Sequence, residues 1–241
     1  MVREDNMLLT IVVTVLDEKE TIIEAIRQVE ALDLEKEIIV VDNFSTDGTR
    51  ELLKSYGSDA IKIVFQDRNY GYGQSIITGC DMAKGKYLYV HMSDLEYDPI
   101  YAHQMIEIAE EEGSDAVFGS RLANNTQGFF ATVRKRPYFL ASIISTRMIN
   151  FFYKKNFTDI IGSKFYRVSS LRSLCPFDDV SLTFDFELVS KLCKRGYRVD
   201  EIPITYNPRS SREGKKIKYY HSFPALVALL KVWLLDKGKK A

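Results

Sequence analysis

Residues 87–99 read Tyr-Leu-Tyr-Val-His-Met-Ser-Asp-Leu-Glu-Tyr-Asp-Pro, and this stretch decides the fold because an apolar run passes directly into three acids. The apolar part, residues 87–90, predicts a buried strand, and a charged side chain is costly to bury. Three carboxylates at the end of such a strand therefore hold a positive group or lie in a wet cleft. Residues 38–41 repeat the arrangement, because another apolar run leads directly into Asp42.

Apolar runs alternate with helical patterns through the first half of the chain. Continuous runs of this kind are typical of strands in a parallel sheet that is covered on both faces. The alternation predicts an α/β fold, a Rossmann-like, mostly parallel sheet flanked by helices. Ligands bind at the carboxyl ends of the strands in such sheets, which is where Asp42 and Asp94 lie. We expect strands at 8–16, 38–41, 61–65, 87–90 and 116–119, and helices beginning near 21, 49, 73 and 99.

The pattern changes after Arg121. Two segments in the second half combine apolar and basic residues at helical spacing, which suits either a core-facing helix or an interfacial helix on an anionic membrane. We expect helices at 137–155, 186–196 and 223–235, and strands at 165–167 and 198–204. The chain is predicted to be one domain, 1–241, with halves of about 8–120 and about 121–241.

Composition excludes several classes of protein. Lys plus Arg and Asp plus Glu both number 33, so no net field favours nucleic acid as a partner. Three cysteines are too few for a disulfide framework or a zinc site. No apolar run reaches the roughly 20 residues that span a bilayer, and no signal-peptide pattern opens the sequence, so we expect a cytoplasmic protein.

Asp94 and Glu96 are candidate metal ligands. They are two residues apart in an extended segment and project to the same side. Carboxylate oxygens suit Mg²⁺ or Mn²⁺, which typically bind substrate phosphates as well. The alternative is a cluster of capping acids before Pro99, and Asp98 fits that description.

Two other acidic positions each have two interpretations. Asp42 either accepts hydrogen bonds from a nucleobase or ribose, or is satisfied by backbone N–H groups of its own loop. Asp185 and Glu187 begin a helix, where acids are favoured by the helix dipole, but one of them could serve as a general base in a cleft.

Two loops could face an anionic ligand. Arg68 and Asn69 open a glycine-rich turn that lacks the spacing of a nucleotide-binding fingerprint. Residues 207–216 form a basic loop, which is either a solvated surface or a lid whose arginines bind phosphates in a bidentate manner.

Several segments occur in an order that characterises one family. They are 14–18 (Thr-Val-Leu-Asp-Glu), 41–49 (Val-Asp-Asn-Phe-Ser-Thr-Asp-Gly-Thr), 68–71 (Arg-Asn-Tyr-Gly), 93–99, 119–121 (Gly-Ser-Arg), 184–196, 201–203 and 208–215. Together they resemble family 2 glycosyltransferases of the GT-A fold, in particular the dolichol-phosphate mannose synthase and polyprenyl-phosphate glycosyltransferase group. The resemblance covers roughly residues 8–220.

The resemblance implies a role for each conspicuous residue. The first half would bind the nucleotide sugar and the second half the acceptor. Asp94 and Glu96 would hold Mg²⁺ or Mn²⁺ on the donor diphosphate. The expected donor-binding residues are Thr14, Leu16, Glu18, Asp42, Arg68, Asn69, Ser93, Asp94, Arg209 and Lys215, and the expected acceptor-binding residues are Arg121, Arg134 and Asp159.

The implied reaction is an inverting transfer in which the metal and the basic lid neutralise the departing diphosphate. A polyprenyl or dolichyl phosphate acceptor is already ionised and needs no base, and Arg121 and Arg134 would orient it. Such an enzyme would rest peripherally on the inner face of the cell membrane. A hydroxyl acceptor would need a base, for which Glu187 and Asp185 are the candidates, with Asp159 behind them.

Three departures from the family pattern keep alternatives open. Met92 replaces the first acid of the Asp-x-Asp motif, and methionine is a poor ligand for a hard cation. Thr14 replaces a proline and Asp17 an asparagine. The alternatives are a soluble transferase that acts on a sugar or protein hydroxyl, and a non-catalytic relative that binds nucleotide sugars.

Overall fold

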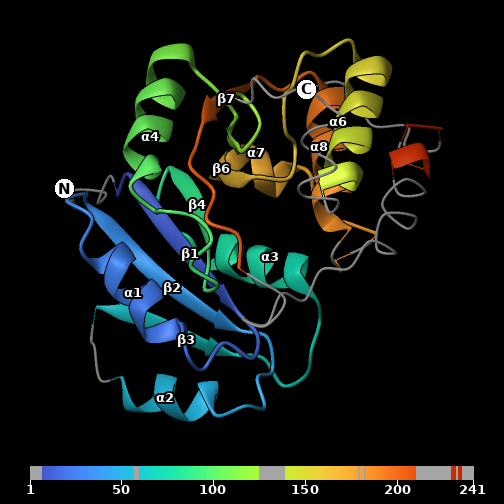
Figure 1. Ribbon diagram of the computed structural model, residues 1–241. Helices are drawn as coiled ribbons and strands as arrows, with labels where there is room; N and C mark the ends of the chain where they lie inside the picture. The colour runs from blue at the N-terminus through green and yellow to red at the C-terminus, as the bar shows by residue number, and fades with distance from the viewer. Residues whose placement is uncertain are drawn as a thin grey trace.

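A computed structural model describes residues 7–56, 60–124, 139–178, 180–181, 183–209, 229–231 and 233–234. The described chain folds around a seven-stranded sheet of order β3-β2-β1-β4-β6-β5-β7 (Figure 1). The strands are β1 (Leu9–Val15), β2 (Lys36–Asp42), β3 (Ile61–Phe65), β4 (Tyr87–Met92), β5 (Ala116–Ser120), β6 (Ser163–Arg167) and β7 (Val199–Pro203). β6 runs antiparallel to β4 and β5, and the other pairs are parallel. The predicted α/β class is therefore confirmed.

Helices cover both faces of the sheet. They are α1 (Ile22–Glu30), α2 (Thr49–Ser55), α3 (Tyr72–Met82), α4 (Tyr101–Glu112), α6 (Phe139–Tyr153), α7 (Val168–Ser173) and α8 (Phe184–Arg195). One apolar cluster packs α1, α2 and α4 against the sheet, and a second packs α3, α6, α7 and α8 against the other face. This three-layer arrangement is visible in Figure 1.

The sequence of β1 explains why it lies in the middle of the sheet. All seven of its residues are buried. Val12 packs into the cluster on the α3 side and Val13 into the cluster on the α1 side, because successive side chains of a strand point to opposite faces. A strand that is apolar on both faces is stable only between two layers of helices.

The structure differs from the sequence predictions at the start of α1 and in the region of β6 and α7. The sequence around Thr21 suggests a capping box with Glu24, but Thr21 makes no side-chain cap to α1, and its hydroxyl instead donates to Glu18 Oε2 at 3.1 Å. α7 and the antiparallel pairing of β6 have no periodic signal in the sequence. Of the helix predicted at 223–235, only 229–231 and 233–234 are described, and these residues are helical.

Candidate functional site

The carboxyl ends of β1, β2 and β4 lie side by side, as their parallel register requires. Val15 pairs with Asp42, and Thr14 pairs with Met92. Each of the three loops that follow contains a non-glycine residue in the left-handed region, with φ of 50° at Asp17, 72° at Phe44 and 59° at Leu95. Such conformations cost energy and concentrate at functional sites, so this edge of the sheet is the candidate site.

Arg209 joins three carboxylates at this edge. Its guanidinium donates to both carboxylate oxygens of Glu18, at 2.7 and 2.9 Å, and lies 3.9 Å from Asp94 Oδ2. Its backbone N–H donates to Glu96 Oε1 at 2.9 Å. We call Glu18, Asp94, Glu96 and Arg209 the strand-end cluster. Residues 191 positions apart in the sequence therefore form one charged group.

Asp94 is electrostatically the least satisfied member of the strand-end cluster. Burial raises its pKa to about 6 from the usual 3.8, and the neighbouring charge of Glu96 adds to the rise. A raised carboxyl pKa means that nearby positive charge does not compensate the negative charge. Arg209 contacts Asp94 only distantly, so a divalent cation would supply the missing charge. Asp94 thus fits the role of a metal ligand.

Glu96 is occupied by protein partners. Besides the Arg209 N–H, the hydroxyl of Tyr206 donates to Glu96 Oε2 at 2.8 Å, and the Asn207 N–H donates to the Glu96 carbonyl at 3.0 Å. Glu96 therefore fixes the segment 206–209 over the strand ends. Among the described residues, no three His, Cys, Asp or Glu side chains form a group that could hold a metal ion. A cation beside Asp94 would take most of its ligands from phosphate and water, as Mg²⁺ and Mn²⁺ commonly do.

Asp42 is buried and bound by its own neighbourhood. Arg50 of α2 pairs with Asp42 Oδ2 at 3.0 Å, and the Ser45 N–H lies 3.3 Å from both carboxylate oxygens. The guanidinium of Arg50 also lies over the rings of Phe44 and Phe65, at 5.4 and 5.2 Å. The geometry agrees with the interpretation of Asp42 as a locally satisfied loop acid. Its predicted contact with the nucleoside stays a prediction.

The turn that carries Arg68 and Asn69 is fixed to the end of β2. Asn43 Nδ2 donates to Asn69 Oδ1 at 2.9 Å, and the Tyr70 N–H donates back to Asn43 Oδ1 at 2.9 Å. Arg68 is exposed, and its guanidinium lies 4.5 Å from the centre of the Tyr70 ring. Ser93 is turned inward, and its hydroxyl donates to the carbonyl of Thr14 at 3.0 Å.

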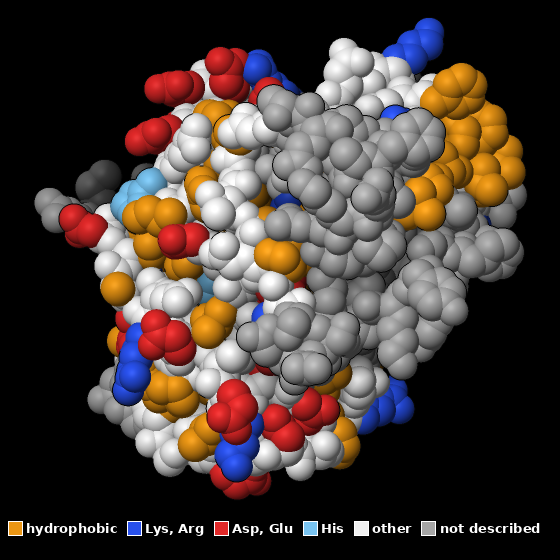
Figure 2. Space-filling view, viewed as in Figure 1, with side chains coloured by type: hydrophobic (Ala, Val, Ile, Leu, Met, Phe, Trp, Pro, Cys, Tyr) orange, Lys and Arg blue, Asp and Glu red, His pale blue; other side chains and the backbone are white. Residues whose placement is uncertain are grey.

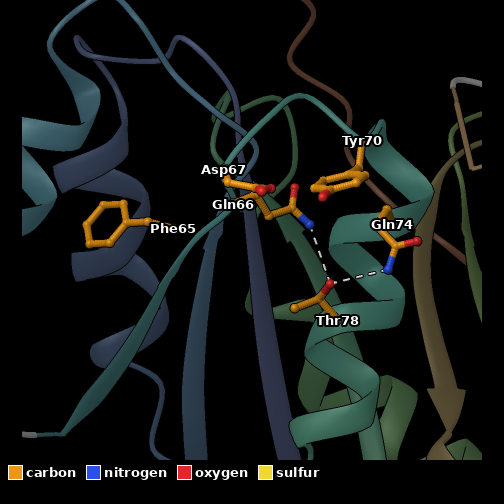
Figure 3. Close-up of a pocket in the computed structure, with 6 residues that line it drawn as sticks. All are labelled: Phe65, Gln66, Asp67, Tyr70, Gln74 and Thr78. Carbon is orange, nitrogen blue, oxygen red and sulfur yellow. Dashed lines mark hydrogen bonds between the residues drawn. The ribbon is translucent and has the colours of Figure 1, made fainter.

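A hollow of about 410 Å³ lies between the end of β3 and α3 (Figure 3). We call it the β3–α3 pocket, and it is lined by Phe65, Gln66, Asp67, Tyr70, Gln74 and Thr78. The side-chain amides of Gln66 and Gln74 both donate to Thr78 Oγ1, at 3.4 and 3.5 Å. Nothing in the sequence marks this pocket, because its residues come from two elements and carry no motif.

The predicted acceptor residues Arg121 and Asp159 form a buried ion pair. Arg121 donates from Nε to Asp159 Oδ2 at 2.6 Å and from Nη2 to Asp159 Oδ1 at 3.0 Å. Burial would raise the pKa of Asp159, but Arg121 beside it holds that pKa below its usual value. The guanidinium is also stacked between Phe139 and Tyr206, at 4.8 and 5.2 Å. Arg121 directly follows β5, and Asp159 lies in the loop after α6 and accepts from Ser142 of α6, so the pair holds these segments together. Its contact with an acceptor stays a prediction.

The two candidate bases differ in their surroundings. Glu187 pairs with Lys191 at 2.7 Å and accepts the Asp178 N–H at 3.0 and 3.1 Å. Asp185 Oδ1 is buried and has no hydrogen-bond partner in the part of the chain that the structure describes. Burial raises the pKa of Asp185, and the charge of Lys164 opposes the rise. Of the two, Asp185 has the properties of a proton acceptor.

α6 buries three small polar side chains together with Phe139 and Ile149, and it exposes other apolar side chains. Ser142, Ser145 and Thr146 are buried, and Ser142 donates to Asp159 Oδ1 at 2.6 Å. Leu140, Ile144 and Phe151 are 40%, 37% and 81% exposed. Figure 2 shows the resulting apolar surface at the upper right, where Figure 1 places α6. No helix in the described ranges is long and apolar enough to traverse a bilayer.

Some predicted residues cannot be placed, and some unpredicted ones matter. Arg134 and Lys215 lie outside the described residues. Arg50 and Gln66 contribute to the strand-end region but were not predicted. A basic residue eight positions after Asp42, on the helix that follows, was a usable signal for Arg50, whereas nothing in the sequence distinguishes Gln66.

Comparisons with known proteins agree with this fold. The sequence model of the family described as Glycosyl transferase family 2 matches residues 10–175. The glycosyltransferase AglJ of Haloferax volcanii is 30% identical over 178 residues, which are 71% of this chain and 54% of that protein. A dodecaprenyl-phosphate galacturonate synthase of Rhizobium johnstonii is 29% identical over 147 residues, 58% of this chain and 43% of that protein. The chain spans about half the length of the curated relatives it matches.

Two solved structures share the architecture at low sequence identity. Glucosyl-3-phosphoglycerate synthase from Mycobacterium tuberculosis, in complex with Mn²⁺, UDP and phosphoglyceric acid, superposes with a TM-score of 0.69 at 15% identity and covers 96% of this chain and 80% of that one. S. aureus TarS 1–349 in complex with UDP-GlcNAc gives a TM-score of 0.64 at 17% identity, covering 96% and 68%. At these identities the likeness establishes the GT-A fold.

Proposed function

Because this chain belongs to glycosyl transferase family 2, we propose that it transfers a sugar from a nucleotide-diphosphate sugar with inversion, and that its acceptor is a polyprenyl phosphate. The diphosphate lies across the carboxyl ends of β1 and β4 in this proposal. The solved relatives described above were crystallised with UDP or UDP-GlcNAc, which supports a nucleotide-sugar donor.

The strand-end cluster is the observation that carries the proposal. A diphosphate is neutralised by a metal cation and a guanidinium together. Asp94 would bind the cation and Arg209 supplies the guanidinium, and both belong to one cluster. Mg²⁺ or Mn²⁺, when bound, would neutralise the leaving diphosphate. Asp94 would hold it, and Glu96 would keep Arg209 in place. Fixed charges of this kind accelerate the reaction because they stabilise the negative charge that develops on the leaving group.

The lipid-phosphate acceptor has two supports. A relative with 29% identity is named a dodecaprenyl-phosphate galacturonate synthase. The exposed apolar face of α6 would rest against the hydrocarbon of a bilayer surface, as interfacial helices do. Arg121, directly after β5, donates from Nη2 to the hydroxyl of Ser142 on α6 at 3.2 Å. A peripheral position on the inner face of the cell membrane follows from this proposal.

A hydroxyl acceptor is the second candidate, and Asp185 favours it. A hydroxyl must lose its proton as it attacks, and a carboxylate with a raised pKa and an unpartnered oxygen is suited to accept that proton. Asp185→Asn separates the two candidates. Loss of turnover at undiminished donor binding supports a hydroxyl acceptor, whereas retained turnover supports a phosphate acceptor, which needs no base.

The experiment that tests the proposal is a donor screen with the intact chain. UDP-, GDP- and other nucleotide sugars are offered with Mn²⁺ or Mg²⁺ and short-chain polyprenyl phosphates, and release of the nucleoside diphosphate is measured. We expect the wild type to turn over one of the donors and Asp94→Asn to turn over none. Absence of turnover together with tight donor binding would exclude the polyprenyl-phosphate acceptor and leave a hydroxyl acceptor or, in line with Met92, a non-catalytic binding protein. Absence of donor binding would overturn the proposal.

A further inference from the structure

We propose that Lys164 is a positioning residue that keeps the carboxylate of Asp185 ionised, so that Asp185 accepts the proton of a hydroxyl acceptor. This inference rests on the second candidate of the proposed function, the hydroxyl acceptor, and adds a residue to its site. In the step concerned, the acceptor oxygen bonds to the anomeric carbon of the sugar, and its proton passes to Asp185. The bond from that carbon to the diphosphate breaks, and the diphosphate keeps the electron pair.

Lys164 is a buried cation to which the described part of the chain gives no ion-pair partner. Its side chain is 2% exposed, and its Nζ donates to the carbonyls of Ile160 and Gly162, both at 2.8 Å. Nζ also lies 4.9 Å from the centre of the Phe118 ring, and the face of an aromatic ring stabilises positive charge. A buried ammonium group without a counter-ion is costly, so its charge calls for an explanation.

Lys191 shows the contacts of a buried lysine whose charge is locally neutralised. It is 7% exposed, its Nζ donates to the carbonyl of Pro176 at 2.6 Å, and it lies 4.5 Å from the centre of the Phe177 ring. These contacts resemble those of Lys164, but Lys191 also pairs with Glu187 at 2.7 Å. Because Lys164 has no such direct partner in the described chain, its charge acts on carboxylates farther away.

The register of β6 places Lys164 on the face of the sheet that α8 covers. Tyr166, two residues farther along β6, packs into the apolar cluster of α3, α6, α7 and α8. Residues i and i+2 of a strand point to the same face, so Lys164 lies on the side of Tyr166. Phe184 and Phe186 pack the beginning of α8 into the same cluster, and Asp185 lies between them in the sequence. Lys164 and Asp185 therefore lie in one buried layer.

The electrostatic coupling between Lys164 and Asp185 is mutual. Burial raises the pKa of Asp185, and Lys164 opposes this rise more strongly than any other described charge. Burial lowers the pKa of Lys164, and Asp185 opposes this fall most strongly, followed by Asp159. Arg121 already binds both carboxylate oxygens of Asp159. The acid left for Lys164 is Asp185, whose buried Oδ1 has no hydrogen-bond partner within the described residues.

The other groups that face Asp185 supply less positive charge. Arg121 opposes the rise in the pKa of Asp185 less than Lys164 does, and it is engaged by Asp159. Tyr72 on α3 and Tyr166 on β6 also feel the charge of Asp185. Burial and then that charge raise the pKa values of both tyrosines, so both hydroxyls stay neutral at neutral pH. Lys164 is therefore the group whose removal should change the protonation of Asp185 most.

The first test follows the protonation of Asp185 without any substrate. Infrared difference spectra between each protein and its Asp185→Asn derivative isolate the band of the protonated carboxyl during a pH titration. Lys164→Gln removes the charge and keeps an N–H donor for the two carbonyls. We expect Asp185 to take up its proton at least about one pH unit higher in Lys164→Gln than in the wild type, the smaller effect of a neighbouring opposite charge. Lys36→Gln, which removes another lysine bound to two carbonyls, is the matched control and should titrate as the wild type does.

The second test is the pH dependence of kcat with hydroxyl acceptors. The kcat of the wild type should fall as the pH falls through the pKa of Asp185, because the protonated carboxyl accepts no further proton. In Lys164→Gln this fall should begin at a higher pH by the same interval, and kcat should approach the wild-type value at alkaline pH. A structural loss would lower kcat equally at every pH, and this result would overturn the inference.

Asp185→Asn provides a measurement that does not depend on the folding of Lys164→Gln. Coupled titrations are reciprocal, so Lys164 should release its proton at a lower pH in Asp185→Asn than in the wild type. Carbon NMR of labelled lysine side chains measures this shift. An unchanged titration of Asp185 in folded Lys164→Gln, or of Lys164 in Asp185→Asn, would overturn the inference and leave the proposed function standing.

The remaining outcomes concern the proposed function. Retained turnover by Asp185→Asn would remove the hydroxyl acceptor, and with it the role of Lys164 in the reaction. Absence of donor binding by the wild type would overturn the transferase proposal as a whole. Both titrations need no ligand, so they still show whether Lys164 holds Asp185 in its ionised form.

Discussion

Asp94 and Asp42 both follow a buried strand, yet their electrostatic environments differ. Arg50 and a backbone N–H neutralise Asp42 directly, whereas Asp94 shares its surroundings with two further carboxylates. Position at a strand end therefore does not by itself distinguish a structural acid from a binding acid. The number of positively charged groups close to the carboxylate distinguishes the two.

The raised pKa of Asp94 predicts how stability depends on pH in the metal-free protein. The folded-state pKa, about 6, exceeds the usual 3.8, so the folded chain holds this proton more tightly than the unfolded chain. The stability contributed by protonated Asp94 is full below about pH 4 and is lost as the pH rises through 6. Asp94→Asn cannot ionise, so with a chelator present it should melt higher than the wild type at pH 7.5.

Calorimetric melting at pH 4.5 and pH 7.5 measures this difference. The gap in melting temperature between Asp94→Asn and the wild type should be larger at pH 7.5 than at pH 4.5. Asp33→Asn, which changes an exposed acid, should show no such widening. An unchanged gap would mean that Asp94 is not electrostatically strained, and the metal-ligand assignment would lose its main physical support.

At the scale of elements, α6 is the helix whose orientation the sequence leaves open. Its apolar residues suit a core-facing helix and an interfacial helix equally well. In the fold, Ser142 and Thr146 face inward because Asp159 and the Ile160 N–H need hydrogen-bond partners there. Burying those polar groups together satisfies them, and it leaves Ile144 and Phe151 outside.

The exposed face of α6 predicts binding to lipid surfaces. An apolar side chain of this size contributes about 1.5–3 kcal/mol when fully buried, and each 1.4 kcal/mol is tenfold in affinity. Replacing both Ile144 and Phe151 by serine should therefore reduce flotation with phosphatidylglycerol-containing vesicles at least tenfold. Ile100→Ser, an exposed isoleucine beside α4, is the control and should float normally. Equal flotation of the double variant and the wild type would contradict the membrane proposal.

At the scale of the whole molecule, Tyr206 joins the two halves that the sequence predicts. Its ring lies under the guanidinium of the Arg121–Asp159 pair, and its hydroxyl donates to Glu96 of the strand-end cluster. The first half and the second half of the chain are thereby held in one arrangement. The division at about residue 120 is a prediction from the sequence, and across it the contacts are continuous.

Arg121→Met should destabilise the protein strongly. It leaves the Asp159 carboxylate buried without its cation, and breaking a buried pair in this way costs about 3–5 kcal/mol. Urea unfolding measures the loss. Arg198→Met removes an arginine whose ion pairs are half-exposed and screened by solvent, so it should cost much less than Arg121→Met. If Arg121→Met is as stable as Arg198→Met, the pair is not structural, and a direct role of Arg121 in acceptor binding would gain weight.

The sequence by itself determined the alternation of strands and helices, the parallel sheet and the edge at which Asp94 lies. These features follow from local periodicity and from the cost of burying charge, and both can be inferred from consecutive residues. Only the tertiary structure decided which partners each acid has. Arg209 reaches Glu18, Arg50 neutralises Asp42 and Gln66 is enclosed beside α3, because contacts between residues distant in the chain depend on how the layers pack. Periodicity within a segment carries no information about such contacts.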